Sequence, residues 1–169
     1  FYLNIKSSEY VHNRAKAFLV NPYSPLPDLI HSNFPKINTF IPDYFMFLCI
    51  SLTLFYSSSL INIEKNVLCV GICLIIRSIS ICLTIMPSCM PKPSSNSNIY
   101  IKWFCSTHDL MFSGHTCFFI FMGKIIGGYT EYFIGYILPI TLVMSKIHYS
   151  IDILVSMFVY NYINLFMIK

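Results

Sequence analysis

Apolar residues gather in long runs that short polar breaks separate, and this alternation dominates the chain. The runs cover residues 42–61, 67–86, 111–127, 132–148 and 150–168. A lipid hydrocarbon core about 30 Å thick takes roughly 20 helical residues to cross, and the runs approach that length. The pattern therefore predicts five transmembrane helices.

The breaks between the runs carry residue types that interrupt or end helices. A Glu-Lys-Asn break lies at 64–66, and a loop rich in Pro, Ser and Asn fills 87–110. A Gly-Gly pair at 127–128 and a His-Tyr corner at 148–149 separate the remaining runs. We expect an all-α fold, a polytopic membrane helix bundle, in a single domain over residues 1–169.

Residues 1–41 differ from the rest, because prolines and polar residues punctuate them. This segment is typical of a surface loop with short interfacial pieces. The chain opens on Phe1 rather than methionine, so we interpret residues 1–5 as the end of an earlier helix. On this interpretation the chain is N-terminally incomplete, and the visible helices are five of an expected six.

Composition supports lipid as the solvent of this fold. Hydrophobic residues make up 56% of the 169 residues and charged residues only 11%, whereas charged residues are about 25% of an average soluble domain. A soluble protein with a buried helical core is the alternative, but consecutive apolar runs leave it too little polar surface. The net charge of +4 is scattered rather than clustered, so we expect no nucleic-acid partner.

Following the runs across a bilayer brings three ionisable residues to one face. If each run crosses once, the loop at 87–110 and the corner at 148–149 lie on the same side. His115 stands near the start of the third run, and His148 and Asp152 flank the start of the last. We therefore expect these three side chains to converge.

The types and spacing of these residues indicate phosphoryl-transfer chemistry. Asp152 follows His148 by four residues, so the two side chains can share a helix face and a hydrogen bond. The carboxylate would fix the imidazole tautomer and leave the other nitrogen to attack an electrophile. His115 is then available to donate and accept protons. A lone interfacial histidine is more often a solvated or capping residue, but an Asp in an apolar span is a functional candidate by default.

Two other polar residues near these motifs, Arg77 and Asp109, each allow two interpretations. Arg77, inside the second run, either forms a structural pair or supports a phosphate cavity. Asp109 either contacts a head group or a histidine, or caps the following helix. Gly114, after Ser113, permits close backbone approach to a ligand. We interpret His12, His31 and His108 as loop residues.

Four segments resemble the signatures of sphingomyelin synthases and related ceramide phosphotransferases, in the family order. Residues 112–116 (Phe-Ser-Gly-His-Thr), with Asp109 ahead of them, resemble the third signature, and 148–153 (His-Tyr-Ser-Ile-Asp-Ile) look like the fourth. Residues 77–79 (Arg-Ser-Ile) are similar to part of the second. Residues 24–28 (Ser-Pro-Leu-Pro-Asp) match a Pro-Leu-Pro-Asp segment that follows the family's first helix.

The resemblance implies the six-helix core that these enzymes share with type 2 lipid phosphate phosphatases. The site would face the lumen or exterior in the Golgi, the endoplasmic reticulum or the plasma membrane. His148 would take phosphocholine from phosphatidylcholine with Asp152 orienting it, and His115 would protonate the diacylglycerol leaving group and then deprotonate the ceramide hydroxyl. The substrate-binding residues carried over by the motifs are Asp109, Arg77, Ser113, Gly114 and Tyr149. No metal or other cofactor is expected.

The sequence leaves several alternatives open. The same triad could serve a phospholipase C-like hydrolase that uses water, the polar residues could line a non-enzymatic lipid-binding or transport protein, and a two-His, one-carboxylate metal hydrolase is conceivable. His108 replaces the family's glycine before Asp109, which bears on the head group: choline, ethanolamine or inositol. The phosphatases' Ser-Arg pair is replaced by Thr141-Leu142. Abundant Ile, Asn and Lys suggest an AT-rich coding sequence of protozoan type.

Overall fold

The structure, a computed structural model, describes residues 2–19, 25–56, 60–89 and 110–167. Within those ranges all regular structure is helical, which confirms the all-α prediction. The elements in chain order are α1 (Tyr2–Phe18), α2 (Leu29–Asn33), α3 (Phe40–Tyr56), α4 (Leu60–Leu83), α6 (Gly114–Ile126), α7 (Gly128–Tyr132), the π-helix η1 (Phe133–Ile137), α8 (Ile140–Met144) and α9 (Ser150–Met167).

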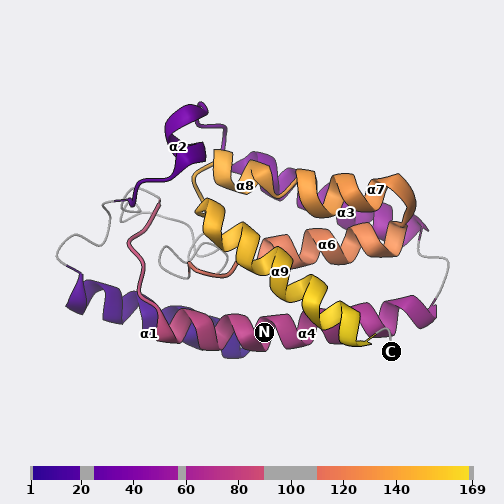
Figure 1. Cartoon of the computed structure of the whole chain (residues 1–169), viewed down its shortest axis with the longest axis horizontal. Helices are drawn as coiled ribbons and strands as arrows, with labels where there is room; N and C mark the ends of the chain where they lie inside the picture. Colours follow the sequence, from indigo (N-terminus) through magenta and orange to yellow (C-terminus); the bar gives the residue numbers. More distant parts are fainter. Residues whose placement is uncertain (1, 20–24, 57–59, 90–109, 168–169) are drawn as a thin grey trace.

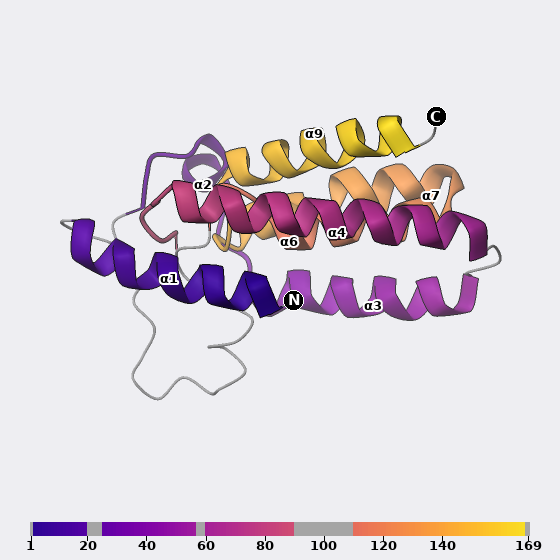
Figure 2. The ribbon, with the colours of Figure 1, turned by 90° about the horizontal axis from the view of Figure 1, so that it is seen from below.

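Helix α6 is the centre of the bundle. It packs against α3, α4, α9 and η1, and Figure 1 shows it between the α3, α7 and α8 side of the molecule and α4. Helix α1 lies along α4, and Figure 2 shows α1 and α9 on opposite sides of α4. Every helix that carries a predicted catalytic residue therefore borders α6 or is α6 itself.

Two buried apolar clusters hold this arrangement, and α6 contributes to both. Phe119 and Met122 of α6 pack with Leu142 and Ile153 in the first cluster. In the second, Ile120 packs among residues of α4 and α9. Because α6 is apolar on nearly all sides, it can face partners in several directions at once, as expected of a buried helix.

The predicted break between the first two runs is wrong in position. Glu64, Lys65 and Asn66 lie inside α4, which begins at Leu60. Glu and Lys are good helix formers, so charge alone does not interrupt the helix. Helix α4 ends at Leu83, ahead of the predicted end at residue 86.

The N-terminal segment is more helical than the sequence indicates. Instead of ending near residue 5, α1 continues to Phe18. Ser7, Val11 and Ala15 are its buried residues, and their one-turn spacing gives α1 a stripe of small side chains that packs closely on α4. Arg14 also donates a hydrogen bond to the carbonyl oxygen of Cys82 at 3.0 Å. The prolines that made residues 1–41 resemble a loop all follow α1 in the sequence.

The fourth apolar run is not one continuous helix. Helices α7, η1 and α8 occupy residues 128–144, and Pro139 is the N-cap of α8. Proline supplies no backbone N–H, and a π-helical turn is rare in a regular helix. The predicted span at 132–148 is therefore divided and ends at Met144, short of His148.

Among the described residues, two helices are long and apolar enough to cross a membrane, Ile63–Leu83 and Ser150–Met167. Phe40–Phe55 and Gly114–Ile126 are shorter apolar helices. By length and composition, the structure supports two of the five predicted spans, and the others stay predictions.

Candidate active site

The end of α8 sets the path of the chain into His148. Ser145 caps α8, and Lys146 follows in the left-handed conformation with φ of 58°. The N–H of Lys146 donates to Val143 O at 2.9 Å and that of Ile147 to Leu142 O at 3.2 Å, the pair of bonds that defines a Schellman motif. This turn directs His148 into the protein, where it is 4% exposed.

Asp152 binds His148 and also caps its own helix. Its Oδ2 atom accepts from Nδ1 of His148 at 3.1 Å and from the backbone N–H of Tyr149 at 3.0 Å. Tyr149 immediately precedes α9, so the second bond is the N3-to-N-cap half of a capping box. Because the carboxylate acts as an acceptor, Nδ1 of His148 carries the proton. In the neutral imidazole, Nε2 then presents its lone pair.

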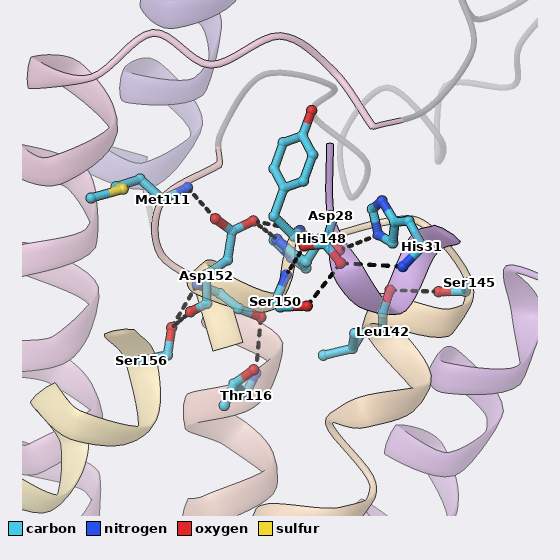
Figure 3. A network of polar contacts seen from close by, with 12 residues as sticks. Asp28, His31, Met111, Thr116, Leu142, Ser145, His148, Ser150, Asp152 and Ser156 are labelled. Atoms are coloured by element: carbon cyan, nitrogen blue, oxygen red, sulfur yellow. Dashed lines mark hydrogen bonds and ion pairs between the residues drawn. The ribbon is translucent and has the colours of Figure 1, made fainter. Parts of the chain in front are cut away.

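The other oxygen of Asp152 is held from outside α9. Its Oδ1 atom accepts from the backbone N–H of Met111 at 2.8 Å, as Figure 3 shows. Met111 has φ of 84°, an unfavourable conformation for a residue with a side chain, and such strain clusters at functional sites. The strained residue is thus the one whose N–H completes the buried carboxylate's hydrogen bonds.

The N-terminus of α6 is fixed to α9 by serine hydroxyl groups. Ser113 caps α6, and its Oγ accepts from the N–H of Thr116 at 3.2 Å. Its own backbone N–H donates to Oγ of Ser156 at 2.7 Å, and that hydroxyl donates to the carbonyl oxygen of Asp152 at 2.7 Å. Ser113 and Ser156 are both fully buried. The predicted substrate-binding Ser113 thus has a clear role in positioning α6.

His115 and His148 face each other across this junction. Their ring centroids lie 6.1 Å apart with an angle of 61° between the ring planes. The convergence of His115, His148 and Asp152 expected from the sequence is therefore confirmed as geometry.

Arg77 reaches the same place from α4. A Cβ atom added to Gly114 would lie 3.5 Å from Nε of Arg77, so the guanidinium packs against the glycine that precedes His115. The NH1 group of Arg77 donates to Oδ1 of Asn4 at 2.6 Å. Arg77 is thus paired with a side chain of α1, in agreement with the structural interpretation, and its predicted role toward phosphate stays a prediction.

Tyr149 lies at the corner, but its hydroxyl is engaged within the protein. The hydroxyl donates to the carbonyl oxygen of Pro87 at 3.0 Å and accepts from the N–H of Leu26 at 2.8 Å. Tyr149 is 2% exposed. Its position suits holding the 25–28 segment against α9 better than contact with a ligand.

Sequence reasoning missed two residues of this neighbourhood, Asp28 and His31. Asp28 binds Ser150 at the start of α9, and Nε2 of His31 donates to the carbonyl oxygen of His148 at 3.1 Å. The available signal was the match of residues 24–28 to a family segment, which identified the aspartate without giving it a partner. His31 had no signal and was interpreted as a loop residue.

Asp109 and His108 lie outside the described residues, so the predicted contact of Asp109 with a head group stays a prediction. In the part of the chain that the structure describes, no group of three His, Cys, Asp or Glu side chains has the arrangement of a metal site. The Asp152 oxygens in particular are used by the N–H donors of His148, Tyr149 and Met111.

No protein-family model and no curated protein matches this sequence. The resemblance to sphingomyelin synthases therefore rests on the motif residues alone.

Proposed function

We propose that the protein is a lipid head-group phosphotransferase embedded in a membrane. The observation that carries the proposal is the buried hydrogen bond of 3.1 Å from Nδ1 of His148 to Asp152, with His115 opposite at 6.1 Å between ring centroids. A buried carboxylate that orients a histidine, with a second histidine across from it, is the arrangement that an activated nucleophile and a general acid require.

The distribution of polar and apolar residues supports a membrane setting. Large apolar side chains point outward along α3, α4 and α9, among them Phe47, Leu54, Leu68, Ile79, Phe158 and Leu165. Asp152, His148, Ser113 and Ser156 are buried inside. Such an arrangement is costly in water, where large exposed apolar patches are rare, and is suited to lipid. On this proposal the helices form a polytopic bundle with the site at the luminal or exterior face.

A phosphate group has a suitable position beside the two histidines. In the first turn of α6 the N–H of Thr116 is bonded to Ser113 Oγ, whereas the N–H groups of Gly114 and His115 have no acceptor within the helix, and a helix N-terminus favours an anion. The guanidinium of Arg77 packs against Gly114 in that first turn and is a chemical match for phosphate. The electrophile would thus be bound where Nε2 of His148 can reach it.

The first step forms a phosphohistidine. The Nε2 lone pair of His148 attacks phosphorus, the bond from phosphorus to the diacylglycerol oxygen breaks, and protonated His115 gives that oxygen its proton. Asp152 stabilises the cationic imidazole as the new bond forms. Diacylglycerol leaves, and the phospho-head-group stays on His148.

The second step reverses these roles with a different alcohol. Neutral His115 takes the proton of the acceptor hydroxyl, the oxygen attacks phosphorus, and the bond from phosphorus to Nε2 of His148 breaks. The motif resemblance makes phosphatidylcholine the proposed donor and ceramide the acceptor. With water as acceptor, the same residues would act as a phospholipase C-like hydrolase.

Vesicles that contain phosphatidylcholine labelled in its choline group test the proposal. With ceramide present, the purified protein is expected to move the label into a new lipid, and His148→Ala is expected to abolish this. His12→Ala in α1, a histidine outside the site, serves as the matched control and is expected to retain activity. Label that appears only as soluble phosphocholine would contradict transfer and favour the hydrolase.

Two further results would reject the wider proposal. A substrate-dependent lipid movement that survives His148→Ala would favour a binding or transport protein. Release of the protein from membranes by alkaline carbonate would contradict the membrane-embedded bundle. We expect it to stay with the membrane pellet.

A further inference from the structure

The first role of Asp28 is that of an ordinary helix cap. It is the N-cap of α2, and its Oδ1 atom accepts from the backbone N–H groups of Ile30 at 3.0 Å and His31 at 3.2 Å. Aspartate is among the preferred residues at this position because it satisfies N–H groups that the helix leaves open. Taken alone, these contacts serve only the short helix α2.

The same carboxylate also binds the start of α9. Its Oδ2 atom accepts from the backbone N–H of Ser150 at 2.8 Å, and its Oδ1 atom accepts from the Ser150 hydroxyl at 2.9 Å. Ser150 is the first residue of α9 and lies 122 positions along the chain. One side chain thus joins two helix N-termini, as Figure 3 shows.

The residues that Asp28 holds adjoin the two partners of the proposed nucleophile's hydrogen bond. Ser150 lies between His148 and Asp152 in sequence. His31, whose backbone Asp28 binds, donates from Nε2 to the carbonyl oxygen of His148 at 3.1 Å, and its ring lies 5.6 Å from that of Tyr149. The corner is therefore held by Asp152 within α9 and by Asp28 and α2 from the other side.

We propose that Asp28 is a positioning residue that fixes His148 opposite His115 through its bonds to Ser150 and α2. The inference rests on the proposed function of the His148 site. Its physical basis is that backbone bonds of the turn after α8 fix the corner only on the α8 side. From His148 to Ser150, where the chain has no regular secondary structure before α9, side-chain bonds from His31, Asp152 and Asp28 hold it. A displacement of about 1 Å in a reacting group can cost about 10²-fold in rate.

Asp28→Asn separates this role from the capping of α2. An asparagine with its oxygen at the Oδ1 position still accepts from Ile30 and His31. Its NH₂ group replaces Oδ2 and meets the N–H of Ser150, so two donors face each other. The variant therefore keeps α2 capped and breaks the backbone bond to α9.

The experiment measures kcat and KM for head-group transfer with the full chain in vesicles. We expect Asp28→Asn to lower kcat at least about tenfold and to change KM less than about twofold, because substrate contacts are retained while the nucleophile is misplaced. The matched control is Asn38→Ala. Asn38 is an exposed residue whose Oδ1 accepts from the N–H of Phe40 at 3.0 Å near the start of α3, and its loss is expected to leave kcat unchanged.

A second variant tests the same link between Asp28 and α9 if Asp28→Asn is poorly folded. Ser150→Ala removes only the hydroxyl bond to Asp28 and keeps the backbone bond. Its kcat is expected to fall by a smaller factor, about threefold, at constant KM, on the scale of one lost hydrogen bond. An unchanged kcat in a folded Asp28→Asn or Ser150→Ala protein would overturn the inference.

A readout without turnover keeps this inference separate from the proposed function. Acylation of histidines by diethyl pyrocarbonate, followed by mass spectrometry, reports the reactivity of His148 itself. We expect Asp28→Asn to change the rate at His148 severalfold and to leave the rate at His12 unchanged. If wild-type protein shows no transfer, the proposed function fails, and equal rates at His148 in both proteins would overturn the positioning role as well.

Discussion

Asp152 accepts a hydrogen bond from Nδ1 of His148 at 3.1 Å with the same oxygen that accepts the N–H of Tyr149 at 3.0 Å. The residue that orients the proposed nucleophile is therefore also the residue that begins its helix. One carboxylate thus has a structural role and a proposed catalytic role, so a variant must separate them.

Asp152→Asn is expected to lower kcat strongly while the variant still folds. The amide keeps one acceptor oxygen but presents NH₂ at the other position, so Nδ1 of His148 or a backbone N–H loses its acceptor. The wrong tautomer of a catalytic histidine costs up to about 10⁴-fold in a serine protease, and we expect a loss of at least about 10²-fold here. Transfer kinetics and thermal unfolding in detergent measure the two effects. A kcat within threefold of wild type in a folded variant would contradict the orienting role.

The effect of His115→Ala on the reaction rate should depend on the leaving group of the donor. With phosphatidylcholine the alkoxide needs a proton, and loss of a general acid costs about 10²- to 10⁴-fold. With p-nitrophenyl phosphocholine the phenolate leaves without one. We therefore expect His115→Ala to retain an initial release of nitrophenolate close to that of wild type. His148→Ala is the comparison and should release none, since it lacks the nucleophile, so equal impairment of His115→Ala with both donors would contradict the general-acid assignment.

Two substitutions distinguish the two interpretations of Arg77, as a phosphate-binding residue or as a structural partner of α1. If it binds phosphate, Arg77→Lys should raise KM for the phospholipid donor about tenfold, because lysine lacks the planar fork of donors. Asn4→Ala removes the partner of Arg77 at 2.6 Å and should raise KM less. If Arg77 is only a structural partner of α1, both variants should lower the unfolding temperature by similar amounts and leave KM unchanged.

Two glycines give opposite predictions for stability. A Cβ at Gly123 would lie 2.8 Å from the backbone oxygen of Glu131, whereas a Cβ at Gly71 in α4 meets nothing within 4 Å. Gly123→Ala is therefore expected to destabilise the fold by about 1–3 kcal/mol. Gly71→Ala should instead stabilise it by about 0.5–1 kcal/mol through helix propensity. Thermal unfolding of both variants in one detergent measures the difference, and equal shifts would contradict the close packing of α6 and α7.

Low pH should weaken the hydrogen bonds by which the Asp28 carboxylate joins α2 to α9. Burial by itself raises the pKa of the Asp28 carboxyl, but hydrogen bonds from the Ser150 backbone, the His31 backbone and the Ser150 hydroxyl outweigh it, and the pKa lies below its ordinary value of 3.8. A group whose pKa is lower in the folded state stabilises that state above its unfolded pKa and loses this effect as pH falls through its folded pKa. The stability advantage of wild type over Asp28→Asn should therefore be constant above about pH 5 and shrink below pH 3.8. Unfolding midpoints of both proteins across this range provide the measurement, and a difference independent of pH would contradict it.

The helical nature of the chain could be predicted because long apolar runs leave few alternatives. The spacing of four residues also predicted the bond between His148 and Asp152, although for a different reason. His148 precedes the N-cap Tyr149 instead of lying on α9, and Asp152 reaches back to it from the first turn of the helix. The break at 64–66 was misplaced because charge was given more weight than helix propensity. The π-helical turn of η1 has no clear sequence signal.

The sequence by itself predicted the long apolar helices α3, α4, α6 and α9, the pairing of His148 with Asp152 and the approach of His115 to that pair. Only the tertiary structure decided that Met111 adopts φ of 84° to donate to Asp152, that Arg77 packs against Gly114, and that Asp28 joins α2 to α9. The physical reason is the range of the interactions. Periodicity encodes contacts within one helix, whereas a bond between residues 122 positions apart exists only after several helices have packed together.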